Sequence, residues 1–162
     1  ENVAEHSWHI ALMATLLSEY AAAPVDIARV IEMLLAHDLV EIDAGDTMIY
    51  DEDGRRDKQD SEVRAAERIF ALLPSDQGER LRALWDEYEE WETHEARFAY
   101  ALDRLQPLLH NLNTEGMMWR EHGITLSQVL AVNQRMADGA PALWEYVRPL
   151  IEAAAEKGYL AR

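Results

Sequence analysis

Apolar residues recur at the spacing of an α-helix along almost the whole chain, and this pattern constrains the fold more than any other feature. Ile10, Met13 and Leu17, for example, fall on one helix face. No segment alternates apolar and polar residues as a half-buried strand does, and no internal repeat is present. With seven glycines and five prolines in 162 residues, long disordered tracts are not expected. The pattern predicts an all-α fold, a single compact domain over residues 1–162 with about seven helices.

Proline, glycine and capping residues predict where these helices begin and end. We expect Gly45 to end the second helix, Ser75 to cap the fourth, and Pro141 to occupy the first turn of the last. The helices are expected over residues 3–22, 25–43, 61–73, 75–91, 93–121, 125–138 and 141–157. The polar segment 46–60 is predicted to be a surface loop.

The charge balance restricts the partners. Thirty-one acidic and fifteen basic residues give a net charge of −16, which repels nucleic acid polymers and anionic membranes. No stretch approaches the roughly 20 apolar residues that span a bilayer, and no signal peptide is visible. The chain has no cysteine, which excludes disulfides and thiolate metal ligands. We therefore expect a cytoplasmic protein that binds neither nucleic acid polymers nor membranes.

Several polar residues occupy positions where a core residue is expected. His37, Asp38 and Glu41 continue the apolar stripe of the second helix, His6 stands at the head of the first stripe, and Asp103 lies in a strongly apolar segment. Burying a carboxylate is costly unless it is paired, hydrogen-bonded or bound to a metal. Two imidazoles and two carboxylates suit one divalent ion, drawn from Mn, Co, Ni, Fe, Zn and Mg.

In a second interpretation, each of these residues has its own hydrogen-bond or ion-pair partner in the protein. A histidine on an apolar face is usually a hydrogen-bonded core residue, and Asp103 has Arg104 as a neighbour with which to pair. His9 is expected to have a packing or hydrogen-bonding role, and Trp8 is expected in the core. From the residue pattern alone, the metal site and the set of separate contacts both stay open.

Four short motifs occur in a fixed order: ENVAEHS at residues 1–7, HDLVE at 37–41, GD at 45–46 and ALDRL at 101–105. Together they resemble the HD-domain 5′-deoxynucleotidases, and within them the HD-domain-containing protein 2 family. The resemblance extends over residues 1–112 and does not include residues 113–162. It is carried by the ordered set, because a His-Asp pair alone is a weak signal.

The resemblance implies an HD-domain helical bundle that hydrolyses deoxyribonucleoside 5′-monophosphates with one divalent metal, and it implies a homodimer. It assigns the metal ligands to His6, His37, Asp38 and Asp103. Glu41 corresponds to the proton-transferring carboxylate, and Asp46 to a residue that contacts the substrate. The family also places a phosphate-holding arginine shortly before the first motif, so we expect further residues upstream of Glu1.

Two alternatives remain at this stage. The first is another HD hydrolase, acting on a nucleotide diester, a polyphosphate alarmone or a different monophosphate. Two-metal HD phosphodiesterases use additional histidines after the His-Asp pair, and only His94 lies between Asp38 and Asp103, which favours one metal. The second is a non-catalytic nucleotide-binding module, against which the retention of all four ligands and Glu41 argues.

Overall fold

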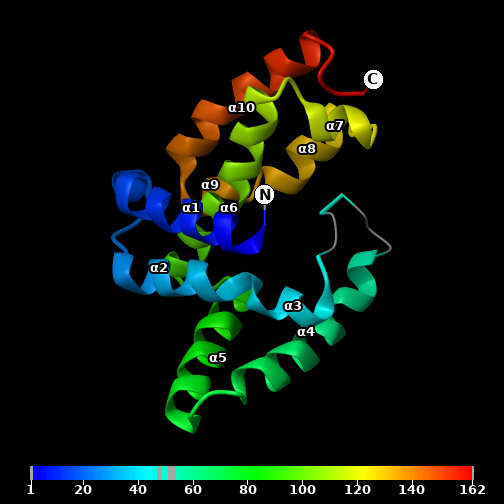
Figure 1. Cartoon of the computed structure of the whole chain (residues 1–162). Coiled ribbons are helices and arrows are strands. Elements are labelled where there is room, and N and C mark those ends of the chain that lie inside the picture. The colour runs from blue at the N-terminus through cyan, green and yellow to red at the C-terminus, as the bar shows by residue number, and fades with distance from the viewer. Residues whose placement is uncertain (1, 47–48, 51–53, 162) are drawn as a thin grey trace.

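The structure, a computed structural model, describes residues 2–46, 49, 50 and 54–161, and within the last range it describes side chains from residue 59 onward. The helices in chain order are α1 Val3–Leu17, α2 Ile27–Ala36, α3 Glu41–Ala44, α4 Gly54–Phe70, α5 Ser75–Glu90, α6 His94–Asn113, α7 Met117–Glu121, α8 Leu126–Asn133, α9 Met136–Gly139 and α10 Pro141–Glu156 (Figure 1). Two 3₁₀ turns, η1 Ser18–Tyr20 and η2 His37–Val40, follow α1 and α2.

The all-α prediction is confirmed. Within the described ranges, the extended pairing is limited to one isolated bridge between Thr125 and Ala161. Seven of the described helices have at least eight residues, in agreement with the expected number. Among the described residues, no helix is both long and apolar enough to cross a bilayer.

Helix α6 is the central element of the bundle and contacts α1, α2, α5, α9 and α10 (Figure 1). Its buried face carries Phe98, Leu102 and Leu105, which join the main hydrophobic core with residues of α1, α2, α8 and α10. Asp103 and Gln106 are buried on the same helix, so two polar groups lie directly beside this core. Their partners come from α6 itself and from the elements packed against it.

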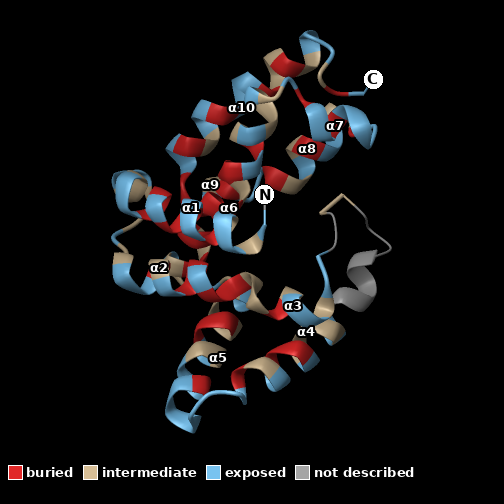
Figure 2. Cartoon of the chain, in the orientation of Figure 1, coloured by how far each residue is buried: buried red, intermediate tan, exposed pale blue. Residues whose placement is uncertain are grey.

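A second, smaller hydrophobic cluster joins η2 to α4 and α5, and Figure 2 shows buried residues along the facing sides of these elements. It contains Val40, Ala65, Ala66, Phe70 and Trp85. Because α2 belongs to the main core and η2 to the smaller cluster, residues 37 and 38 lie at the junction between the two.

The expected helices of the first half require correction. The helix predicted over residues 3–22 ends at Leu17, and the one predicted over 25–43 divides into α2, η2 and α3 before ending at Gly45 as expected. The loop prediction for residues 46–60 is wrong from Gly54 onward, because α4 begins there. Ser75 is the first residue of α5 and makes no cap bond, since the N-cap position is Pro74. Trp8 is 65% exposed rather than in the core, because α1 turns that face outward.

The second half also contains more breaks than expected. The helix predicted over residues 93–121 divides into α6 and α7, because Glu115 and Gly116 adopt positive φ angles of 56° and 69°. The one predicted over 125–138 divides into α8 and α9. The expected position of Pro141 in the first turn of the last helix is confirmed. The helices expected to start at Thr93 and Thr125 do start there, because these two residues cap α6 and α8 through their hydroxyl groups.

One glycine allows α9 to approach the central helix. A Cβ atom added to Gly139 would lie 1.9 Å from the carbonyl oxygen of Arg97 on α6. The carbonyl of Gly139 also accepts a hydrogen bond from the amide of Ala22 at 2.8 Å. Glycine at this position therefore permits the packing of α9 against α6.

Candidate metal centre

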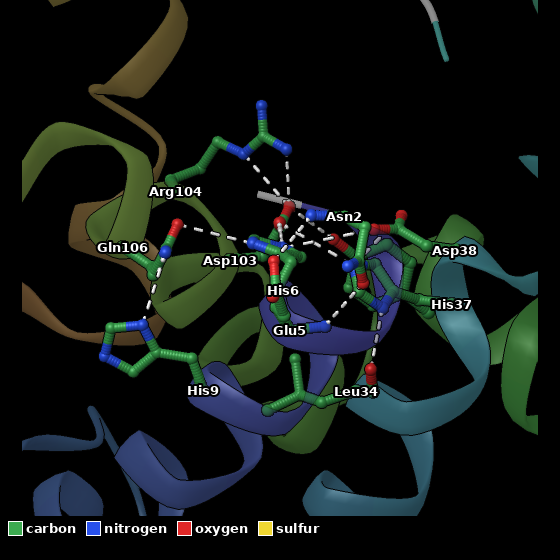
Figure 3. Close-up of polar contacts among 11 residues, drawn as sticks. Asn2, Glu5, His6, His9, Leu34, His37, Asp38, Asp103, Arg104 and Gln106 are labelled. Carbon is green, nitrogen blue, oxygen red and sulfur yellow. Dashed lines mark hydrogen bonds and ion pairs between the residues drawn. The ribbon is translucent and has the colours of Figure 1, made fainter. Parts of the chain in front are cut away.

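Four polar side chains from three elements converge at the junction of the two hydrophobic clusters (Figure 3). His6 comes from the first turns of α1, His37 and Asp38 from η2, and Asp103 from the middle of α6. Their sequence separation reaches 97 residues between His6 and Asp103, so only the tertiary packing brings them together.

A capping box fixes the start of α1 just before His6. The Asn2 side chain accepts a hydrogen bond from the Glu5 amide at 3.0 Å, and the Glu5 carboxylate accepts one from the Asn2 amide at 3.1 Å. Since these reciprocal bonds satisfy free amide groups at a helix N-terminus, they hold the first turn in place. The residue that follows them is His6, which the helix directs toward α6.

The distances between ligand-type atoms are short. His6 Nε2 lies 3.0 Å from Asp103 Oδ1 and 4.0 Å from Asp38 Oδ2. His37 Nε2 lies 3.1 Å from Asp38 Oδ1 and 3.6 Å from Asp103 Oδ1. One ligand atom each from His6, His37 and Asp38 falls within 4.8 Å of the others, a separation that suits a single ion.

The two carboxylate oxygens of Asp103 face different partners. Oδ1 lies toward the two imidazoles, whereas Oδ2 accepts hydrogen bonds from the Tyr88 hydroxyl at 2.9 Å and from Arg104 Nε at 3.1 Å. Arg104 Nη2 also pairs with Oδ2. Donors on one oxygen fix the direction of the other, an arrangement typical of residues that orient a metal ligand.

His37 provides the clearest test of whether a metal fits these residues. Its Nδ1 donates a hydrogen bond to the Leu34 carbonyl at 2.9 Å, which leaves Nε2 directed at the carboxylates. Nε2 is buried and makes no hydrogen bond to any described residue. A buried ring nitrogen is rarely left without a hydrogen bond. A divalent cation would satisfy it, because the cation would bind this nitrogen and the neighbouring carboxylate oxygens together. The residues therefore fit a metal.

The electrostatics agree with a cation-binding cluster. Burial opposes the charged form of His37, but the nearby carboxylates of Asp103 and Asp38 raise its pKa to about 9. Burial alone would raise the pKa of Asp103, yet Arg104 and the two imidazoles hold it well below its usual range. Asp103 is consequently ionised, and the carboxylates attract positive charge to the position between His6 and His37.

A further pair of contacts connects His6 to the outer part of the site. His6 Nδ1 lies 3.3 Å from Gln106 Oε1, and Gln106 Nε2 lies 3.3 Å from His9 Nδ1 (Figure 3). Since the amide oxygen can only accept, His6 Nδ1 carries the proton and Nε2 is available to a metal. The hydrogen-bonding role expected for His9 is confirmed.

The cluster opens into a cavity of about 920 Å³. Both carboxylates predicted to act on the substrate, Glu41 and Asp46, line this cavity together with His6, His37 and Asp38. Glu41 begins α3 directly after η2, whereas Asp46 is exposed just beyond Gly45. The structure thus places all six predicted site residues around one cavity. Glu1, the first residue of the first motif, lies outside the described residues.

Sequence reasoning missed two groups that the structure places at the site. Tyr88 lies on α5 and contacts Asp103, and Gln106 lies three residues after Asp103 on the same face of α6. Gln106 could have been found from its spacing of three residues from Asp103. Tyr88 could not, because nothing in the sequence indicates that α5 packs against α6 at this point. His94 is exposed at the start of α6, as expected for a residue outside the cluster.

Comparisons with known proteins agree with this geometry. A profile of the HD domain family matches residues 1–144. Two proteins named 5′-deoxynucleotidase HDDC2 are similar to this chain: the Xenopus laevis protein is 32% identical over 71% of this chain and 56% of its own length, and the human protein is 31% identical over 67% and 52%. The chain therefore spans about half the length of these curated relatives.

A solved structure is also similar over the whole chain. It is the crystal structure of a predicted metal-dependent phosphohydrolase from Magnetospirillum magnetotacticum MS-1, with 56% sequence identity and a TM-score of 0.94. The match covers 100% of this chain and 81% of that chain.

Proposed function

Because this chain belongs to the HD-domain family, we propose that it is a metal-dependent phosphohydrolase that removes phosphate from deoxyribonucleoside 5′-monophosphates. The observation that carries the proposal is the convergence of two imidazoles and two carboxylates at one cavity, with the buried Nε2 of His37 lacking a hydrogen bond. The names of the similar proteins, a 5′-deoxynucleotidase and a metal-dependent phosphohydrolase, support the same reaction class.

We assign one divalent ion to His6, His37, Asp38 and Asp103. A divalent ion bound there supplies positive charge that polarises the phosphoryl group and activates water. Asp103 is oriented as a ligand, because Tyr88 and Arg104 hold its Oδ2 and leave Oδ1 facing the imidazoles. The hydrogen bond from His37 to the Leu34 carbonyl likewise directs Nε2 toward the ion.

The two remaining carboxylates act on the reactants. Glu41 follows the ligands His37 and Asp38 and lines the same cavity, so its carboxylate is available to exchange a proton with the attacking water or the departing 5′ oxygen. Asp46 lies beyond the positive-φ residue Gly45, at an exposed position on the cavity wall. There it hydrogen-bonds the sugar or an ordered water rather than the metal.

A monophosphate is the favoured substrate because the cluster suits one ion. Cleavage of a diester or a triphosphate commonly uses a second ion to bind the bridging or leaving group. The preference for deoxyribose over ribose rests on the similarity to proteins named 5′-deoxynucleotidase.

Phosphate release from a nucleotide panel tests the proposal. Protein treated with a chelator and reloaded with Mn, Co, Zn or Mg should release phosphate from deoxyribonucleoside 5′-monophosphates, and faster than from ribonucleotides. Elemental analysis should show about one divalent ion per chain, which His37→Ala loses. Equal rates on ribo- and deoxyribonucleotides would remove the deoxynucleotidase assignment but keep the phosphatase.

Two other results would replace the proposal. Release confined to diesters or polyphosphate alarmones would identify another kind of HD hydrolase. Nucleotide binding without turnover, whichever metal is added, would identify a non-catalytic module.

A further inference from the structure

The cavity beside the cluster has an unusual charge balance for a phosphate site. Carboxylate side chains form much of its polar lining, and among the described residues that line it the arginines are Arg104 and Arg135, with no lysine. The chain as a whole carries a net charge of −16. A phosphate monoester is itself an anion, so fixed positive charge close to the metal ligands, in addition to the ion, would strengthen its binding here.

Arg104 is linked to the cluster directly. Its Nε and Nη2 both contact Oδ2 of Asp103, whose Oδ1 faces His6 and His37. One carboxylate therefore separates the guanidinium group from the imidazoles. Arg135, in contrast, lies 3.7 Å from the centroid of the Trp91 ring, and no described contact joins it to the cluster.

One edge of the Arg104 guanidinium group is engaged and the other is not. Nη1 makes no hydrogen bond to any residue that the structure describes, and Figure 3 shows it pointing away from Asp103. The guanidinium group also lies 5.5 Å from the Tyr100 ring centroid, a contact that restricts its rotation. Because Arg104 lines the cavity, the two protons on Nη1 are available to a bound anion.

We propose that Arg104 binds a phosphate oxygen of the substrate through Nη1 while its other edge holds Asp103. The proposal rests on the phosphohydrolase function proposed above and names the cation that recognises the phosphate. The planar guanidinium group suits this double role, because its fork of donors can serve two oxyanions at once, which a lysine ammonium group does less well. The side chain would thus couple the orientation of a metal ligand to the position of the phosphate.

The competing explanation is that Arg104 only holds Asp103 in place. Tyr88 separates the two explanations, because its hydroxyl group donates to the same oxygen but reaches Asp103 from α5. Loss of either donor should weaken metal binding, since groups that orient metal ligands typically contribute about 10- to 100-fold in affinity. Only the loss of Arg104 should also weaken phosphate binding after the metal site has been saturated.

The experiment measures the affinity of metal-loaded protein for inorganic phosphate by isothermal titration calorimetry, and KM for the substrate at saturating metal. Arg104→Met should weaken phosphate binding by about 10- to 100-fold, the usual effect of losing a charge-assisted hydrogen bond. Tyr88→Phe should leave phosphate affinity within about twofold of wild type once metal is saturating. Arg104→Lys keeps a cation beside Asp103 and provides a second variant if Arg104→Met does not fold. It should retain metal and still lose phosphate affinity.

Arg82→Met is the matched control. Arg82 makes the same two kinds of contact, a 2.7 Å ion pair with Asp86 and a 5.2 Å approach to the Trp85 ring, but it does not line the cavity. Its substitution should change neither phosphate affinity nor KM.

The outcomes separate the two proposals. Unchanged phosphate affinity in metal-saturated Arg104→Met or Arg104→Lys, or equal losses in Tyr88→Phe, would overturn the role of Arg104 while leaving the hydrolase intact. Absence of phosphate binding by metal-loaded wild type would overturn it as well. Binding of phosphate that depends on Arg104, in a protein that hydrolyses no nucleotide, would support Arg104 and reject the hydrolase.

Discussion

The protonation of His37 links the stability of the metal-free protein to pH. In the folded chain its Nε2 lies 3.1 Å from Asp38 Oδ1 and 3.6 Å from Asp103 Oδ1. Burial opposes the imidazolium, but these carboxylates raise the His37 pKa from 6.5 to about 9. The folded protein therefore holds this proton more tightly than the unfolded chain, in which the imidazole has its ordinary pKa.

The size of the effect follows from the two pKa values of 6.5 and about 9. Each pKa unit corresponds to about 1.4 kcal/mol, so the proton contributes about 3 kcal/mol to the free energy of unfolding. Because the folded pKa is the higher one, the contribution is complete below about pH 6.5, declines as the pH rises, and is lost above about pH 9.

Urea unfolding in the presence of a chelator measures this contribution. Wild type should lose about 3 kcal/mol of stability between pH 6 and pH 9.5 relative to His37→Asn, whose amide retains a donor for the Leu34 carbonyl. Comparing the two proteins cancels the titration of groups that lie away from the cluster, such as the lysines and the exposed histidines. Parallel pH profiles for wild type and His37→Asn would refute the argument.

Three further substitutions test the site and the fold. Glu41→Gln should keep a normal metal content but lower kcat by at least about 100-fold, the usual cost of removing a general acid–base group; recovery of the rate with excess metal would instead show that Glu41 supports the ligands. Asp46→Ala should reduce activity while elemental analysis shows unchanged metal, whereas a lower Tm with full specific activity would indicate a structural turn. Gly139→Ala should destabilise the protein by about 1–3 kcal/mol in chemical unfolding, because its Cβ would lie 1.9 Å from the Arg97 carbonyl oxygen; an unchanged unfolding midpoint would contradict that packing argument.

Local signals predicted much of the helical framework. Thr125 and Gln128 form the capping box that opens α8, and Gly45 ends α3 with a φ of 79°. The main failure concerns the start of α4. Residues 54–60 (GRRDKQD) have no apolar member, so hydrophobic periodicity cannot distinguish a helix from a loop there.

The breaks within helices were missed for a different reason. The segment 25–43 has continuous helical periodicity, yet α2 ends at Ala36 and His37–Val40 form a 3₁₀ turn. The change occurs where the chain passes from the main core to the cluster of Val40, Ala66 and Trp85. Contacts with two separate cores decide this geometry, and local propensity does not encode them.

The sequence by itself determined the all-α class and the set of polar residues that has no place in an apolar core. His37, Asp38 and Asp103 are recognisable because buried charge is costly and therefore needs a partner. Only the tertiary structure decided which partners these residues have and how they are arranged. The contacts of His6 with Asp103 and Gln106 join residues 97 and 100 positions apart, and the donors on Asp103 Oδ2 come from α5 and α6. Such geometry depends on how distant helices pack, because the directions of side chains across an interface are set by both helices at once.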